Sequence, residues 1–102
     1  MRMSTVSTAL KREAESIFTD LGYTVSPDAG EIRAERKWRV VQVTPTAEPD
    51  EIPSSGSMRC FVTFAESVTQ FERKLNRENP DYEWAIIGVT NDDDYVVRRR
   101  SS

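Results

Sequence analysis

The residues best suited to metal binding or catalysis lie between Gly30 and Thr44. Glu31 places a carboxylate near the start of this segment, and Gln42 and Thr44 place an amide and a hydroxyl at its end. A carboxylate is a good ligand for Mg²⁺, whereas an amide binds such ions weakly and a hydroxyl adds no charge. Metal-assisted phosphodiester hydrolysis relies on several charged groups around the ion. Of these three residues, only Glu31 supplies a charged group.

Between these positions, a cluster of cations surrounds one tryptophan: Arg33, Arg36, Lys37, Trp38 and Arg39. Cations bind phosphates while an indole stacks on a base, which is how proteins hold single-stranded nucleic acid. Two plainer interpretations stay open. In the first, Trp38 is a core residue at the start of a strand. The cations, next to Glu31 and Glu35, also fit an ordinary solvated face. The cluster is our candidate nucleic-acid site.

Other candidate metal and catalytic sites are weaker. If the chain were a nuclease, Glu35 or Glu48 would have to complete a site with Glu31. The run Asp92–Asp94 lacks the spacing of a calcium loop and is typical of a hydrated turn. The chain has no histidine and one cysteine, which excludes zinc sites and Cys/His catalysis. We therefore expect no metal site and no cofactor.

The chain of 102 residues, with a net charge of −3, is long enough for one core and too short for two. We expect a single domain over 1–102 with its core at about 5–97, a mobile loop rich in proline at 45–57, and a basic tail at 98–102. Cys60 lies in an apolar run, which predicts a buried thiol and a cytoplasmic protein. We expect no membrane partner, because the sequence contains no long apolar run or signal-peptide core.

Hydrophobic periodicity predicts the elements that position these residues. An amphipathic stripe from Val6 to Leu21, capped by Ser4 or Ser7 and ended by Gly22, predicts a first helix. A capping box at 67–70 and the pair Asn79-Pro80 bound a second helix. Strands are expected at 23–25, 31–35, 38–43, 58–63, 84–89 and 95–97, with a turn over 26–30 and a tight connection at Arg36-Lys37.

This order, α-β-β-β-β-α-β-β, predicts an α/β (α+β) fold in which two helices pack on a mixed sheet of about five to six strands. The segment from 58–63 through the second helix to 84–89 should be a right-handed parallel crossover, because both strands are apolar and the helix between them is amphipathic.

The order of elements, with Leu21–Val25 leading into the 30–44 hairpin, resembles the αβββαβ core of the PD-(D/E)xK, restriction-endonuclease-like superfamily over residues 5–90. Residues 61–75 resemble the strand and helix that follow the catalytic positions in archaeal and Mrr-like members. The resemblance assigns Glu31 to the first acid, Gln42 to the second acid and Thr44 to the lysine. Only Glu31 keeps its chemistry, so the resemblance implies a fold and no reaction. Residues 80–94 also look like small uncharacterised proteins of halophilic archaea.

These features favour a non-catalytic, nuclease-like module that binds nucleic acid or a protein partner through the basic hairpin and the 45–57 loop. Two alternatives stay open. One is a metal-dependent nuclease with a migrated active-site acid, which would need a divalent ion. The other is a homodimeric structural protein in which the edge strand Tyr95–Val97 pairs across a two-fold axis.

Overall fold

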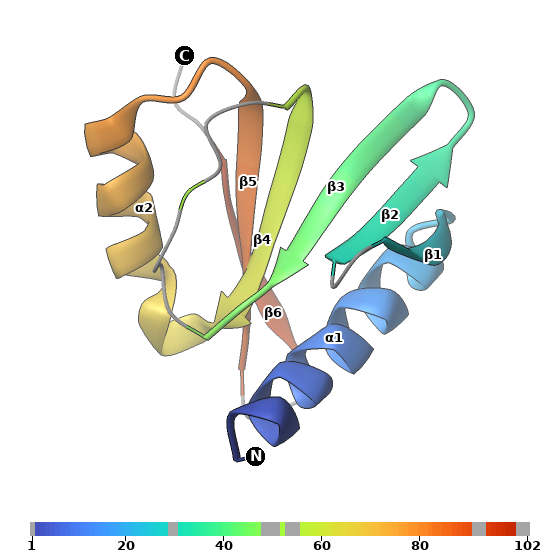
Figure 1. Cartoon of the computed structure of the whole chain (residues 1–102), viewed down its shortest axis with the longest axis horizontal. Coiled ribbons are helices and arrows are strands. Elements are labelled where there is room, and N and C mark those ends of the chain that lie inside the picture. The colour runs from blue at the N-terminus through green and yellow to red at the C-terminus, as the bar shows by residue number, and fades with distance from the viewer. Residues whose placement is uncertain (1, 29–30, 48–51, 53–55, 91–93, 100–102) are drawn as a thin grey trace.

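The computed structural model describes residues 2–28, 31–47, 52, 56–90 and 94–99 (Figure 1). Its elements, in chain order, are α1 (Arg2–Asp20), β1 (Thr24–Asp28), β2 (Glu31–Arg36), β3 (Arg39–Pro45), β4 (Met58–Phe64), a short 3₁₀ helix η1 (Ala65–Ser67), α2 (Val68–Glu78), β5 (Glu83–Val89) and β6 (Tyr95–Arg99).

The six strands form one mixed sheet in the order β1-β2-β3-β4-β5-β6. Strands β1, β2 and β3 are antiparallel neighbours, β3, β4 and β5 run parallel, and β6 returns antiparallel to β5. The predicted mixed sheet with two helices is therefore confirmed, including the parallel β4–α2–β5 unit. The likeness to restriction endonucleases stays a prediction.

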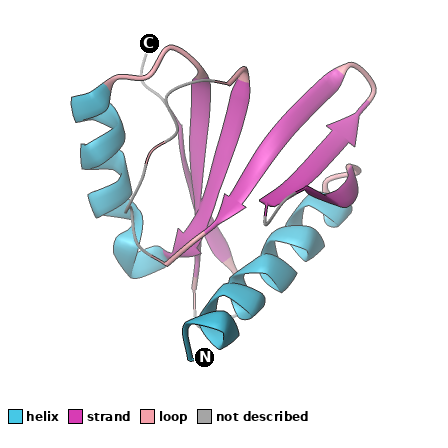
Figure 2. Cartoon of the chain, viewed as in Figure 1, coloured by secondary structure: helices cyan, strands magenta, loops and turns pink. Residues whose placement is uncertain are grey.

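The two helices cover opposite faces of the sheet (Figures 1 and 2). On the α1 face, helix residues such as Leu10 and Phe18 pack against Ile32, Val43 and strand residues of β4 and β5. On the α2 face, α2 packs against residues of β4 and β5: Phe61, Trp84 and Ile86. No residue of β2 or β3 belongs to this second cluster, and polar side chains line the α2 face of these two strands: Glu31, Arg33, Glu35, Gln42 and Thr44.

The helix ends differ in part from the prediction. The expected stripe on α1 is buried at Leu10, Ala14, Ile17 and Phe18, but Leu21 is 45% exposed. The helix ends at Asp20, and Gly22 then reverses the chain with a φ of 92°. Ser4 and Ser7 lie inside α1, so neither can cap it. Ser67 precedes α2 without a side-chain capping hydrogen bond, so the predicted capping box does not form.

Strand boundaries also differ from the prediction, most clearly in β1, at the β2–β3 turn and in β6. Strand β1 continues through Pro27 to Asp28, which is possible because an edge strand tolerates a residue without an N–H. Arg36 pairs with Arg39, so the β2–β3 turn consists of Lys37 and Trp38 and not of Arg36 and Lys37. Strand β6 runs to Arg99 and so includes the first two residues of the expected tail.

A close approach between β5 and η1 fixes how α2 sits on the sheet. A methyl group added at Gly88 would lie 2.4 Å from Cγ2 of Val68 and 2.9 Å from the Cα of Ala65. Only a residue without a side chain fits here. Glycine at this position lets the start of α2 contact the backbone of β5 directly.

Candidate functional site

The three residues assigned by the nuclease resemblance lie together on the α2 face of β2 and β3, where they are half-buried. Glu31 begins β2, and Gln42 and Thr44 lie on the neighbouring strand β3. Gln42 donates from Nε2 to Oε1 of Glu31 at 2.8 Å, and Thr44 donates from Oγ1 to Oε2 at 2.6 Å. All three point to the same face because side chains alternate along each strand.

An arginine that the sequence reasoning missed completes this cluster. Nη1 of Arg59, on β4, lies 3.8 Å from Oε2 of Glu31, and both side chains are largely buried. The Arg59 guanidinium also lies 5.6 Å from the ring centroid of Tyr82. Burial raises the pKa of Tyr82, and the charge of Arg59 partly opposes that rise. A lone cation in the apolar run 58–62 was the signal in the sequence that could have pointed to this residue.

Hydrogen bonds and an ion pair join the side chains of this Glu31 cluster across β2, β3 and β4. Both carboxylate oxygens already accept hydrogen bonds, and the positive charge of Arg59 beside Glu31 opposes the binding of a cation such as Mg²⁺. Glu35, offered as a migrated acid, instead pairs with Arg33 at 2.8 Å. Within the described part of the chain, no three His, Cys, Asp or Glu side chains group to hold a metal. Glu48, Asp92 and Asp93 lie outside the described residues.

The tip of the β2–β3 hairpin carries a tryptophan, Trp38, that lies almost entirely in solvent. Trp38 is 97% exposed, so the expectation that it packs into the core at a strand start is wrong. The physical reason is the turn position: Lys37 adopts a left-handed backbone, with a φ of 55°, and Trp38 is the second turn residue instead of the first strand residue. Trp84, in contrast, is only 4% exposed.

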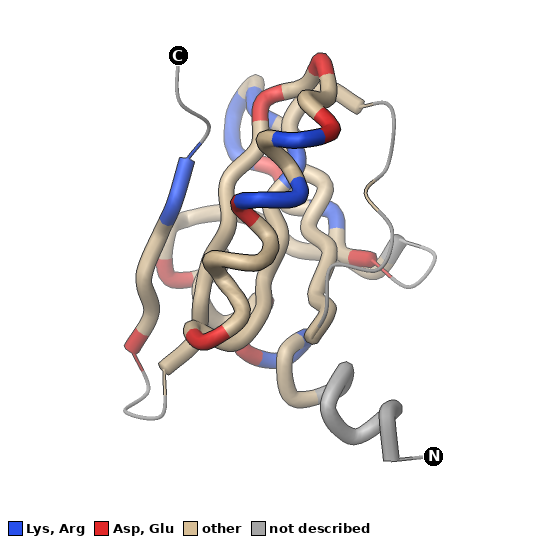
Figure 3. The backbone as a smooth tube through the Cα atoms, turned by 90° about the vertical axis from the view of Figure 1, so that its left-hand side faces the viewer, with Lys and Arg blue, Asp and Glu red and all other residues tan. Residues whose placement is uncertain are grey.

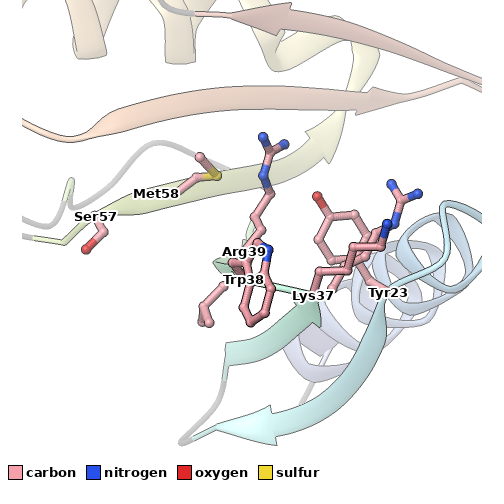
Figure 4. A pocket seen from close by; sticks show the side chains of 8 residues that line it. Tyr23, Lys37, Trp38, Arg39, Ser57 and Met58 are labelled. Carbon is pink, nitrogen blue, oxygen red and sulfur yellow. The ribbon is translucent and has the colours of Figure 1, made fainter.

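Three cations surround the exposed indole: Arg36, Lys37 and Arg39. Together with Tyr23, Val40, Ser57 and Met58 they line a shallow groove of about 770 Å³ (Figure 4). In Figure 4 Trp38 and Arg39 lie between Ser57 and Met58 at the start of β4 on one side and Tyr23 with Lys37 on the other. Arg36 lies over the α1–β1 turn, where its Nε would be 3.5 Å from a Cβ at Gly22.

The two basic segments of the sequence meet at one end of the sheet. Strand β3 begins there with Arg39, and β6 ends there with Arg99; both line a second hollow on the α1 face. Figure 3 shows the basic end of β6 beside the C-terminus, whereas basic and acidic positions are interspersed along α2. Arg33 does not join this group, because Glu35 neutralises it. The candidate nucleic-acid site is thus reduced to the hairpin tip.

A family model described as "Family of unknown function (DUF7116)" matches residues 11–98. The chain belongs to this family. The match extends from α1 into β6 and therefore includes both the Glu31 cluster and the hairpin tip of this DUF7116 member. No curated protein matches the chain at a significant level. Among the described residues, no helix is long and apolar enough to cross a membrane.

Proposed function

We propose that this DUF7116 protein is a non-catalytic module that binds single-stranded nucleic acid through the tip of the β2–β3 hairpin. The observation that carries the proposal is the 97% exposure of Trp38 in a turn between Lys37 and Arg39. An indole held in water on a short hairpin offers a flat surface for an unpaired base. Cations on both sides of it reach the phosphates that flank that base.

The charges around the indole support the same proposal. No described acid forms an ion pair with Arg36, Lys37 or Arg39. Unlike Arg33, these side chains can therefore give their full charge to a phosphate. The whole chain carries −3, so repulsion from the acidic remainder would confine a polyanion to this end of the sheet. Arg99 extends the basic surface beyond the hairpin.

The Glu31 cluster supports binding without hydrolysis. A carboxylate that is hydrogen-bonded by Gln42 and Thr44 and lies beside Arg59 would have to give up these contacts before it could hold a divalent ion. We therefore expect Mn²⁺ and Mg²⁺ to leave nucleic acids uncut in the presence of this protein.

Fluorescence anisotropy with labelled 12-nucleotide single strands of DNA and RNA tests the proposal. Because stacking contributes about 1–3 kcal/mol per base, we expect Trp38→Ala to weaken binding by about 5- to 150-fold. Trp38→Phe should retain part of the affinity. With three phosphate contacts, the slope of log K against log salt should be about −2.

Arg73→Ala is the matched control for Arg36→Ala, because Arg73 is an exposed cation on α2, away from the hairpin. Arg36→Ala should reduce both the affinity and the salt slope, whereas Arg73→Ala should change neither. Equal losses in the two variants, or equal affinity of wild type and Trp38→Ala, would contradict the proposed site. The absence of binding at low salt would contradict the function itself and leave a protein partner for the hairpin tip.

A further inference from the structure

The outer edge of β6 is the sheet edge best suited to accept another strand. Its inner side pairs with β5, no other described strand pairs with its outer side, and all five of its residues are exposed. At the opposite edge, β1 contains Pro27, and proline is a device that protects an edge from further pairing. Strand β6 has no proline, and Val96 and Val97 are 45% and 44% exposed.

The hydrogen bonds of the β5–β6 hairpin show which backbone groups of β6 face outward. The N–H of Thr90 donates to the carbonyl of Asp94 at 2.9 Å, and beyond this pair Val89 is opposite Tyr95. Hydrogen-bonded and non-hydrogen-bonded pairs alternate in an antiparallel ladder. The backbone groups of residues 96 and 98 therefore point to β5, and those of 95, 97 and 99 point to the open edge.

We propose that β6 pairs with β6 of a second copy of this chain, antiparallel, across a two-fold axis at Val97. This register places Val97 opposite the partner's Val97 and Tyr95 opposite the partner's Arg99. The N–H of Tyr95 already donates to Oδ1 of Asp94 at 2.8 Å, so the N–H groups of Val97 and Arg99 supply the backbone hydrogen bonds, about four in total for the two copies. An axis at residue 96 would keep only about two of these bonds, whereas an axis at residue 98 would also allow about four, so the side chains must distinguish the axes at Val97 and Arg98.

The side chains favour the same register. On the α1 face each tyrosine ring meets a guanidinium across the axis, which is a favourable cation–π pair. On the α2 face Val96 meets the aliphatic part of the partner's Arg98. An axis at residue 98 would instead place two arginines directly opposite each other, which is destabilising. The sequence of β6 is thus complementary to itself around Val97, without opposed arginines.

The dimer would extend the sheet through both copies and place the two exposed apolar edges against each other. Tyr95 and Val97 also line the hollow of about 590 Å³ on the α1 face, so the paired edges would continue its apolar lining. A contact of two five-residue strands is small, and we expect a weak dimer with a Kd of about 1–100 μM.

Cysteine cross-linking tests the register with a matched control, because Val96 and Val97 are equally exposed and the native Cys60 is buried. Directly opposed residues on antiparallel strands have Cβ atoms about 4.5–5.5 Å apart, within reach of a disulfide after small adjustments. Val97→Cys should form a covalent dimer under mild oxidation at least about tenfold faster than Val96→Cys. Equal rates in the two variants, or none in either, would overturn the register.

Sedimentation equilibrium of the full chain tests the dimer without any new thiol. Wild type should pass from monomer to dimer with rising concentration, and Val97→Glu should remain a monomer with unchanged circular dichroism. A wild-type protein that stays monomeric up to millimolar concentration would contradict the proposal and leave the β6 edge for an extended segment of another protein. Neither experiment contains nucleic acid, so its outcome is independent of the function proposed for the hairpin.

Discussion

At the scale of single residues, Trp38 and Trp84 use the same side chain in opposite ways. Burial of a large aromatic side chain contributes about 2 kcal/mol or more to stability, and Trp84 gains this in the core under α2. Trp38 gains almost none, because nearly its whole surface stays in water. A hairpin turn needs no tryptophan for its backbone, and the nucleic-acid ligand that we propose would account for the exposed indole.

The difference between these two tryptophans could be predicted only in part. The apolar run around Trp84 predicts a strand covered on both faces, and the structure confirms its burial. For Trp38, burial depended on a shift of the turn by one residue. A turn at Arg36-Lys37 makes the tryptophan a strand residue, whereas a turn at Lys37-Trp38 leaves it in solvent. Because side chains alternate along a strand, an error of one residue reverses burial. No pattern in the sequence fixes that choice.

Cys60 gives a prediction for alkaline pH. Its burial raises the pKa of the thiol from 9.0 to about 12, so above pH 9 the unfolded chain loses a proton that the folded chain keeps. The contribution of the buried, protonated thiol to the free energy of unfolding is therefore complete below pH 9 and is lost as the pH rises towards 12. Between pH 8 and pH 10 we expect urea unfolding to show a loss of about 1 kcal/mol from this group.

Cys60→Ala is the control for this pH dependence. Tyr82 also has a raised pKa and contributes in the same direction at higher pH, so some alkaline destabilisation should persist in the variant. The decline between pH 8 and pH 10 should nevertheless become clearly shallower than in wild type. An unchanged decline would show that the buried thiol is not its source.

At the scale of elements, the Glu31 cluster ties together β2, β3 and β4. Glu31→Ala removes the acceptor of two hydrogen bonds and the carboxylate beside the partly buried Arg59. We expect a loss of about 1–3 kcal/mol in the free energy of unfolding. Glu35→Ala is the control, because the Arg33–Glu35 pair is about half exposed and such pairs contribute less than about 1 kcal/mol. Similar losses in both variants would contradict the role given to the cluster.

The contact between β5 and the start of α2 gives a second prediction at this scale. Gly88→Ala would place its methyl group within 2.4 Å of Val68 and 2.9 Å of the Ala65 backbone. Such overpacking typically costs about 1–3 kcal/mol, which a urea unfolding curve would measure. Adding Val68→Ala should recover only part of the loss, because the backbone of Ala65 remains in the way. A stable Gly88→Ala protein would contradict this packing.

The elements themselves were largely predictable, whereas their ends were not. Two helical stripes and a βαβ pattern fixed the order of elements, because periodicity extends over many residues. Strand β1 was expected to stop at Ser26-Pro27, yet it continues because its outer edge needs no proline N–H. The Glu31 cluster was anticipated at three of its positions through a family resemblance. Its fourth member, Arg59, comes from a different strand, and only the sheet order brings it there.

At the scale of the whole molecule, the apolar cores, the basic end and the unpaired strand edge lie in different parts of the sheet. The α1 face and the α2 side of β4 and β5 hold the two apolar cores. The basic hairpin tip and the end of β6 lie at one end of the sheet, and among the described strands none pairs with the outer edge of β6, where we propose a partner strand. Both proposed binding surfaces can act together, because the hairpin tip belongs to β2 and β3 and the dimer contact to β6.

The most direct test of the central claim uses the indole N–H resonances of the chain's two tryptophans in a ¹H–¹⁵N NMR spectrum. A 12-nucleotide single strand of DNA or RNA would be added at low salt, and Trp38→Phe would assign the resonances. The account predicts that the Trp38 resonance moves with added strand, returns when salt is raised, and leaves the buried Trp84 resonance in place. A Trp38 resonance that stays unchanged at saturating strand concentration would contradict the claim that the hairpin tip binds nucleic acid.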